Sequence, residues 1–556
     1  MAEELDRWFP RPPSASPPRR LGIVVGGSLS KGLEVKLDPQ TVIEGLAVGR
    51  YVVVHGRTGR RFFSLINDVA LDATNPLIEK TPPDASDPFI AQVHRGTTTF
   101  GRIHVAPMLV LEPEDKEPRP VKTVPEHFSE VYEATPEDVA LVFGQKERPG
   151  YFVIGEPLDM AGIPVTLNLE RFVERSAGVF GKTGTGKTFL TRTLLAGIIH
   201  QNVAVTLVFD MHNEYGWKSQ DEARREIKGL RQLFPTKVAV FTLDEESSRR
   251  RGSKIDGAVY IGYDQIEPED VDSLSSLLAL TDVQVGALYF LRRKLGPRWL
   301  ARLLNEEDQL EELQDALEKG TLHGGTLGAI QRKLNLFRRF GFLLDRAPED
   351  PVQRILEYLG RGVSVVLEFG RYGNSLEAYI LVANYITRRI HEHYVRRKEA
   401  AQGGKGEEPR PLVITVEEAH KFLDPAVARH TIFGTIAREL RKYNVTLLIV
   451  DQRPSGIDPE VMSQIGTRVT CLLDDEADIR AVFSGVAGAA PLREVLARLD
   501  TRQQALILGH AVPMPVVVRT RSYGEELYAE VGAGEKPPEE VLARGREVLG
   551  REEVEL

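Results

Sequence analysis

The amino-acid sequence predicts an α/β fold in which a mostly parallel sheet carries helices on both of its faces. Five near-continuous apolar runs alternate with helical stretches in the later part of the chain, and they begin at Ser176, Val205, Val363, Leu412 and Val445. Strands that are buried on both faces have such runs, because the helices that join parallel strands cover the sheet. The 556-residue chain, with 42% hydrophobic and 27% charged residues, also has the composition of a folded protein.

A different pattern precedes this core. Residues 1–20 contain five prolines and no periodic apolar pattern, which predicts a flexible arm. Residues 21–111 contain short β-rich runs, broken by Gly, Asp and Pro at hairpin spacing, and predict a small antiparallel barrel or sandwich. Residues 112–150 are rich in proline and charge and predict a connector.

The α/β core is expected to span residues 151–523. Between about 267 and 344 the sequence has no strong strand but a long run of helical patterning, which predicts a helical subdomain inserted into the core. Residues 524–556 form an acidic tail. Such a tail could brace a neighbouring subunit or have no role, and its composition does not distinguish the two.

Composition also limits the class of protein. The single cysteine, Cys471, excludes an intramolecular disulfide and any cysteine-based metal site. The first residues have no apolar signal core, and no stretch approaches the roughly 18–20 apolar residues of a membrane span. We therefore expect a cytoplasmic protein. The net charge of −9 does not decide whether the partner is a nucleic acid, because a basic channel can lie inside an acidic shell.

A phosphate-binding loop follows the first core strand. The pattern G-x-x-x-x-G-K-[ST] is met by Gly181-Lys182-Thr183-Gly184-Thr185-Gly186-Lys187-Thr188. Its glycines let backbone N–H groups curl around phosphates, Lys187 reaches the β and γ oxygens, and the Thr188 hydroxyl ligates Mg²⁺. The loop lies between the strand 176–180 and a predicted helix over 189–199, so we expect it to bind ATP and Mg²⁺.

Two adjacent carboxylates end the apolar run that begins at Leu412. A P-loop needs a partner carboxylate at the end of a neighbouring strand to hold the metal and polarise a water. Adjacent strand residues point to opposite sides, so the two acids can serve different tasks. We assign Glu417 to the magnesium shell and Glu418 to orienting the attacking water. The alternative is a solvated pair of acids at the start of a helix.

Two further strands end in polar residues. An amide such as Gln452, after the run 445–450, can bond the γ-phosphate or the attacking water. Taken alone, this signal is explained better by a plain loop-start amide, and together with the P-loop and the paired acids it fits a nucleotide sensor. Asp210 and Glu214 follow the run 205–209, and strand ends line the ligand crevice of a doubly wound sheet. Both could face the nucleotide or the metal, or Glu214 could cap the following helix.

Arg438 and Arg441 lie on the helical stretch before Val445. Arginines near the end of a helix are ordinarily solvated. In an oligomeric motor, however, an arginine of one subunit reaches the γ-phosphate of its neighbour and stabilises the charge of the transition state. Both arginines are therefore candidates for this role.

The order of these motifs resembles the HerA family of the ring-shaped HerA/FtsK DNA translocases. The matching segments are Val179-Phe-Gly-Lys-Thr-Gly-Thr-Gly-Lys-Thr, Phe209-Asp-Met-His-Asn-Glu-Tyr, Val416-Glu-Glu-Ala-His-Lys-Phe, Ala437-Arg-Glu-Leu-Arg-Lys-Tyr and Asp451-Gln-Arg-Pro-Ser-Gly-Ile. The resemblance covers residues 151–523 and implies a RecA-like ATPase core, with the family's N-terminal barrel on residues 21–111. Glu417 departs from the aspartate that related ATPases usually have.

The resemblance further implies a homohexameric ring that hydrolyses ATP between subunits and pumps double-stranded DNA through a central channel. A NurA-like nuclease would dock on the barrel, and the pair would resect DNA ends for recombinational repair. By the same resemblance, Glu418 would be the catalytic carboxylate, Gln452 the sensor, and Arg441 the trans arginine, with Arg438 as the second choice. Two alternatives stay open: a motor of an anti-phage defence complex with another effector nuclease, and a nucleotide-dependent scaffold that does not move DNA.

Contacts to DNA in such a channel should be basic and directed mostly to phosphates. The densest basic cluster in the core is Arg249, Arg250, Arg251 and Lys254. We consider it a candidate DNA-contacting loop, and an exposed basic turn is the alternative.

Overall fold

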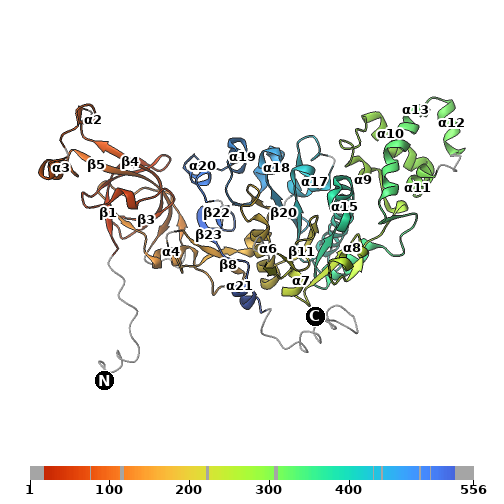
Figure 1. Ribbon diagram of the computed structural model, residues 1–556, viewed down its shortest axis with the longest axis horizontal. Helices are drawn as coiled ribbons and strands as arrows, with labels where there is room; N and C mark the ends of the chain where they lie inside the picture. The colour runs from red at the N-terminus through yellow and green to blue at the C-terminus, as the bar shows by residue number, and fades with distance from the viewer. Residues whose placement is uncertain are drawn as a thin grey trace, which may run out of the picture.

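The computed structural model describes residues 18–75, 77–84, 86–112, 118–158, 160–220, 225–305, 311–429, 431–439, 442–486, 490–500 and 503–532. Three parts follow one another along its longest axis (Figure 1). A β-barrel lies at one end, a large sheet covered by helices occupies the middle, and a group of helices lies at the other end. The fold class predicted from the sequence is therefore confirmed.

Six antiparallel strands close the N-terminal barrel. Their order is β2-β1-β7-β3-β4-β5, and a further pairing of β2 with β5 completes the ring. The strands are β1 (Arg20–Ser28), β2 (Gly32–Leu37), β3 (Tyr51–His55), β4 (Arg61–Ala73), β5 (Thr99–Leu111) and β7 (Glu130–Glu133), and β6 (Arg119–Pro120) pairs with β5 beside the ring. Apolar side chains such as Val35, Val54 and Ile103 fill the interior.

Strand β7 lies within the segment that the sequence assigned to a connector. It pairs with β1 on one side and with β3 on the other, and Val131 at its centre is fully buried. The same segment contains helix α4 (Pro136–Phe143), whose first turn is capped by Thr135 and Asp138. The described part of residues 112–150 thus supplies one barrel strand and one helix.

The central sheet has twelve strands in the order β15-β14-β18-β11-β19-β20-β10-β21-β22-β23-β8-β9. The first eight are mutually parallel: β15 (Gly257–Ala258), β14 (Val238–Thr242), β18 (Ser364–Glu368), β11 (Val205–Asp210), β19 (Leu412–Glu417), β20 (Val445–Asp451), β10 (Ala177–Phe180) and β21 (Thr467–Thr470). The remaining four continue the sheet with antiparallel pairings: β22 (Gln504–Gly509), β23 (Val516–Thr520), β8 (Tyr151–Pro157) and β9 (Val165–Asn168). The five runs identified in the sequence form five adjacent strands, from β18 to β10.

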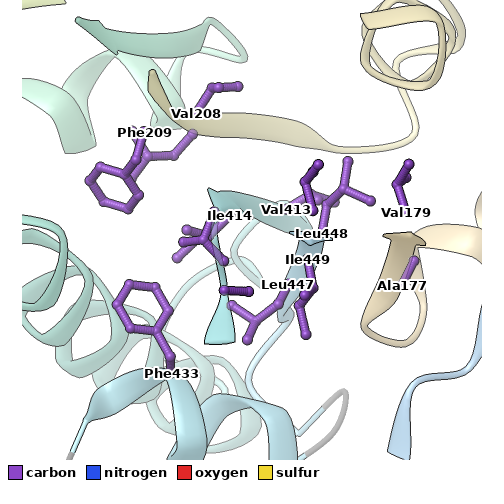
Figure 2. Packing of buried hydrophobic residues seen from close by; sticks show 14 of the residues in the cluster. Ala177, Val179, Val208, Phe209, Val413, Ile414, Phe433, Leu447, Leu448 and Ile449 are labelled. Atoms are coloured by element: carbon purple, nitrogen blue, oxygen red, sulfur yellow. The ribbon is translucent and has the colours of Figure 1, made fainter. Parts of the chain in front are cut away.

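Helices cover the sheet and bury its apolar faces. They include α6 (Lys187–Gln201), α7 (Leu230–Leu233), α14 (Pro351–Gly360), α15 (Leu376–Gln402), α16 (His420–Leu423), α17 (Ile432–Glu439), α18 (Pro459–Gln464) and α19 (Glu476–Val482). Figure 2 shows the side chains of β11, β19 and β20 beside Phe433 of α17. The rings of Phe209 and Phe433 meet edge to face with centroids 6.5 Å apart. Burying such a ring contributes about 1.5–3 kcal/mol, so these contacts fix the strand ends that carry the site.

A short parallel pairing of two strands, two residues each, closes the base of the helical insertion. Strand β16 (Ile261–Gly262) pairs with β17 (Leu343–Leu344), and between them lie α9 (Pro268–Asp272), α10 (Asp282–Leu295), α11 (Trp299–Leu304), α12 (Gln314–Glu318) and α13 (Gly324–Leu334). Trp299 is fully buried and its indole N–H donates to the carbonyl oxygen of Ile266 over 3.0 Å. This bond ties the insertion to its base.

Both ends of the chain extend beyond the described residues. Residues 1–17 of the predicted arm and residues 533–556 of the predicted tail lie outside them. The described start of that tail forms helix α21 (Glu525–Glu530), which packs with buried Leu527 and Tyr528. Among the described helices, none has the length and apolar character needed to cross a lipid bilayer.

Candidate active site

A cavity of about 1060 Å³ opens at the carboxyl edge of the parallel strands. Its lining comes from the loops that follow β10, β11, β19 and β20, and from the segment that follows β23. These loops meet because the carboxyl ends of parallel strands lie at one edge of a sheet. The P-loop residues Thr183–Thr188, both Glu417 and Glu418, and Gln452 all line this cavity.

The P-loop has the backbone conformation that phosphate binding requires. Gly184 and Gly186 adopt positive φ angles of 80° and 91°, and a Cβ atom on either would meet nothing within 4 Å. This open concavity ends at the N-terminus of α6, whose backbone N–H groups and dipole favour an anion. Lys187 begins that helix, and its ammonium group donates to the carbonyl oxygen of Lys182 over 2.8 Å. Burial lowers the pKa of Lys187.

Glu417 is held in a buried position behind the P-loop. Its Oε1 accepts a hydrogen bond of 2.8 Å from the Tyr215 hydroxyl, and its backbone N–H and C=O both bond the Tyr379 hydroxyl at 3.1 Å. Its Oε2 is buried without a hydrogen-bond partner in the described structure. Burial, and then the charge of Asp210, raise the pKa of Glu417 to about 8. A cation would both satisfy the orphan oxygen and favour the ionised form.

These oxygen atoms suit a Mg²⁺ ion. Mg²⁺ usually keeps several waters and is bound through one or two carboxylates together with substrate phosphates. The orphan Oε2 of Glu417 and the hydroxyl of Thr188 are both hard oxygen donors in the lining of the same cavity. The residues therefore fit the ion that the P-loop pattern implies.

A hydrogen-bonded bridge connects Glu418 to the P-loop. The amide nitrogen of Gln452 donates to Glu418 Oε1 over 2.8 Å, and the amide oxygen of Gln452 accepts from the Thr183 hydroxyl. Glu418 has a φ angle of 49°, a left-handed conformation that is uncommon for residues other than glycine. Such strain persists where surrounding contacts fix it, often at functional sites. The geometry thus brings together the two side chains that the sequence singled out as catalytic carboxylate and sensor.

Asp451 and His420 were in the sequence motifs without an assigned role. Asp451 ends β20, and its fully buried carboxylate accepts from the backbone N–H of His420 at 2.7 Å and of Arg453 at 2.6 Å. It also lies 3.0 Å from Nδ1 of His420. Asp451 therefore fixes the loops that carry Glu418 and Gln452. An acid at the end of an apolar strand, one residue before the predicted sensor, was the available sign of this role.

Asp210 was expected to face the nucleotide or the metal, but it is not among the residues that line the cavity. It is fully buried, and its two carboxylate oxygens accept from the backbone N–H groups of Glu214, Tyr215 and Gly216 at 2.7, 2.8 and 3.2 Å. Both oxygens are thus used to shape the loop that follows β11, and the cavity is lined instead by His212 and Glu214 of that loop. Asp210 positions Tyr215, and through it Glu417, because the loop fixes where the tyrosine stands.

Arg438, one of the two candidate trans arginines, lies apart from the cavity of its own chain. Arg438, near the end of α17, donates to Glu460 Oε2 over 3.1 Å, and its side chain is 28% exposed. Arg438 is not among the residues that line the cavity. Arg441 lies outside the described residues.

The basic cluster is divided by the structure. Arg249 and Arg250 are exposed on helix α8 (Glu245–Arg250) and pair with Glu245 and Glu246 one turn earlier. Arg251 instead pairs with a buried group, although its own side chain stays 32% exposed. Its Nη2 donates over 2.8 Å to Oε2 of Glu368, a fully buried carboxylate that also accepts from the hydroxyls of Ser248 and Ser253. Arg251 thus also has a structural contact, and Arg249, Arg250, Arg251 and Lys254 all remain candidates for contacting DNA.

The sequence of the chain is similar to the sequences of known helicases. A model of the HerA helicase central domain matches residues 152–390. The DNA double-strand break repair helicase HerA of Saccharolobus solfataricus is 26% identical over 433 residues, which cover 76% of this chain and 79% of that protein. The protein of the same name from Pyrococcus furiosus is 21% identical over 436 residues, covering 74% and 76%.

Solved structures with a similar arrangement include the plasmid coupling protein TrwB in complex with ADP and Mg²⁺. The TM-score is 0.42 at 14% identity, over 66% of this chain and 89% of that chain. The part that the family model matches contains the P-loop and the strands β10, β11, β14 and β18. The chain is thus similar to HerA helicases, in the central domain over residues 152–390 and, in the curated relatives, over about three quarters of its length.

Proposed function

We propose that the chain is an ATP-driven motor that assembles as a homohexameric ring and moves double-stranded DNA. In this proposal it works with a NurA-like nuclease to resect DNA ends in double-strand break repair. The observation that carries it is the bridge from the P-loop through Gln452 to Glu418, which joins the parts of an ATP-hydrolysing site in one cavity. The names of the curated relatives, DNA double-strand break repair helicases, support the choice of DNA and of repair.

The triphosphate binds along the P-loop. Backbone N–H groups of the loop and the N-terminus of α6 surround the phosphates, and the ammonium group of Lys187 exchanges its bond to the Lys182 carbonyl for one to a phosphate oxygen. Thr188 and Glu417 would hold a Mg²⁺ ion, which would supply positive charge against the charge that develops on the phosphate oxygens. Tyr215 orients the Glu417 carboxylate for this role.

Glu418 orients the attacking water and accepts its proton at the carboxylate. Its fixed backbone and the bond from Gln452 hold the acid in place before the reaction, which lowers the cost of reorganisation in the transition state. Because the same Gln452 amide also bonds the P-loop Thr183, loss of the γ-phosphate changes its surroundings at both ends. Gln452 therefore reports hydrolysis to the loop that follows β20.

A neighbouring subunit of the ring supplies a further positive charge to the site. Arg441, or failing that Arg438, of one subunit reaches the γ-phosphate bound by its neighbour, as an arginine in trans does in other phosphoryl-transfer sites. DNA passes through the ring and is held through its phosphates, because a translocase must ignore sequence. The barrel, at the far end of the molecule from the helical insertion, offers the docking surface for the nuclease.

The test is steady-state ATP hydrolysis by the purified protein with and without long linear double-stranded DNA. We expect strong stimulation by DNA, and a fall of about a hundredfold or more in Lys187→Ala and Glu418→Gln, because each removes one preorganised contact to the transition state. Hydrolysis that is indifferent to DNA, in a preparation that mass photometry shows to be a ring, would contradict translocation and favour a nucleotide-dependent scaffold.

A second measurement addresses the nuclease partner. The pure chain is incubated with linear DNA, ATP and Mn²⁺, and we expect the DNA to stay intact until a NurA-like nuclease is added. Degradation by the chain alone that survives Glu418→Gln would contradict the assignment of cleavage to a partner.

A further inference from the structure

The cavity extends beyond the P-loop to a wall built by the C-terminal part of the chain. This wall contains Arg521, Ser522, Tyr523, Gly524, Glu525 and Tyr528. None of these residues belongs to the P-loop or to the strand-end motifs, and none was singled out in the sequence. A phosphate chain at the P-loop would contact only part of this lining, which leaves the wall for the rest of a nucleotide.

Sheet topology explains why such a late segment lies beside the P-loop. β21 is parallel to β10, and β22 and then β23 each pair antiparallel with the strand before them. Two reversals return β23 to the direction of β10, so β23 ends at the edge where the P-loop begins. The segment after Thr520 therefore emerges next to the nucleotide site, some 330 residues after it in sequence.

Two aromatic rings face the cavity between the P-loop and this wall. Phe189 directly follows Thr188 in the first turn of α6, and its ring centroid is 6.4 Å from that of Tyr523, at an interplanar angle of 41°. Both side chains are half-buried and line the cavity. The hydroxyl of Tyr523 donates to the carbonyl oxygen of Lys228 over 3.0 Å, and the ring meets Tyr528 edge to face at 5.5 Å. Tyr523 is thus fixed from two sides.

A buried arginine supports the same rings. Arg192 is 2% exposed, and its guanidinium carbon lies 5.5 Å from the centroid of Phe189, 5.8 Å from that of Tyr523 and 5.9 Å from that of Tyr215. It also donates to the Ser219 hydroxyl over 2.9 Å. A cation in contact with several aromatic faces holds them in a common arrangement. Arg192 therefore joins the helix of the P-loop, the loop after β11 and the C-terminal wall.

We propose that Phe189 and Tyr523 form the platform on which the base of the nucleotide stacks, and that the wall from Arg521 to Tyr528 determines base recognition. The proposal rests on the proposed function only in taking the ligand to be a nucleotide. Rigid, half-buried rings beside a phosphate site are suited to this role, because every base has a flat face and stacking on an aromatic side chain is favourable.

The experiment separates the base from the phosphates. Binding of Mg·ADP and of Mg·tripolyphosphate, which has no base, is measured by isothermal titration calorimetry on the full-length protein and on Tyr523→Ala. We expect the affinity for ADP to fall roughly 5- to 100-fold, the range typical for the loss of one stacking ring. The affinity for tripolyphosphate should stay within about twofold. Tyr523→Phe keeps the ring and should bind ADP within about threefold of the wild type.

Other outcomes would overturn the proposal. An equal loss for ADP and tripolyphosphate would mean that Tyr523 only supports the phosphate site, and unchanged ADP binding would mean that the base does not stack there. Tyr289→Ala, a 42% exposed tyrosine of the insertion, is the matched control for the substitution itself. The measurement uses neither DNA nor turnover, so its failure is distinct from that of the proposed motor function, which would fail if the wild type bound neither ligand.

Discussion

Replacing Tyr215 with phenylalanine removes one hydroxyl group from the buried side of the nucleotide site. That hydroxyl donates to Glu417 Oε1 over 2.8 Å, and Tyr215 is fully buried. The other carboxylate oxygen, Oε2, already lacks a partner among the described residues. The variant therefore keeps the ring in place but leaves the buried carboxylate without its side-chain donor.

The magnitude follows from these contacts. A hydrogen bond to a charged group contributes about 1.5–3 kcal/mol, and loss of a group that orients a metal ligand lowers metal affinity roughly 10- to 100-fold. We expect the Mg²⁺ concentration for half-maximal ATP hydrolysis by Tyr215→Phe to rise by about that factor. Mn²⁺ binding in the presence of ADP, followed by electron paramagnetic resonance, measures the same change without turnover.

Tyr379→Phe is the matched control, because it removes a buried hydroxyl that contacts Glu417 only through the backbone. It should lower the free energy of unfolding without changing the affinity for the cation. If Tyr215→Phe binds the cation as tightly as the wild type, or if both variants weaken binding equally, then the Tyr215 hydroxyl does not orient a metal ligand and the reasoning fails.

Two further predictions concern the bridge and the divided basic cluster. Gln452→Ala should lower the rate of ATP hydrolysis by about a hundredfold while nucleotide affinity changes only a few-fold, since the amide orients Glu418 rather than the phosphates. A steady-state rate near that of the wild type would exclude this role. Arg251→Met should lower the free energy of unfolding in urea by roughly 1.5–3 kcal/mol, because it removes the charged hydrogen bond to buried Glu368, whereas Arg250→Met should cost less than about 1 kcal/mol. A fully stable Arg251→Met variant would show that this pair does not stabilise the fold.

The strands of the core could be predicted because both of their faces are buried, so that nearly every residue in them is apolar. β11, β18, β19 and β20 are buried along their whole length, so apolar continuity in the sequence corresponds to two covered faces in the structure. Strand β7 has no such apolar run. It has four residues, Glu-Val-Tyr-Glu, and becomes a strand only because it pairs with β1 on one side and β3 on the other. Tertiary pairing decided its state, and the local sequence did not.

The acids at the strand ends show a second limit. Asp210 and Glu417 have the same local pattern, an apolar strand that ends in a carboxylate. Asp210 meets the backbone N–H groups of its own loop, which turns back on itself through Asn213 with a φ angle of 57°. Glu417 meets a tyrosine about 200 residues away in sequence. Which acid keeps a free oxygen depends on loop conformation and on a distant partner, and neither is visible in the pattern.

The triple arginine shows the same limit for charge. The helical spacing that pairs Arg249 and Arg250 with Glu245 and Glu246 ends with α8, and the next residue turns toward the buried Glu368. Three identical neighbours in sequence thus have two environments. The difference arises from where the helix stops and not from residue type.

The completed site makes nucleotide binding depend on packing between distant parts of the chain. The P-loop lies near residue 185, the two acids near 417, and the wall near 523. Arg192 and Gln452 are among the side chains that connect these parts. A ligand that contacts all three binds only the arrangement in which they are assembled, and so it stabilises that arrangement by mass action. Loss of the γ-phosphate would affect only part of this arrangement. Contacts at the P-loop and at Glu418 are lost, whereas the contact between the base and the proposed wall is kept. The C-terminal wall can therefore retain the nucleotide while the loop after β20 changes its contacts.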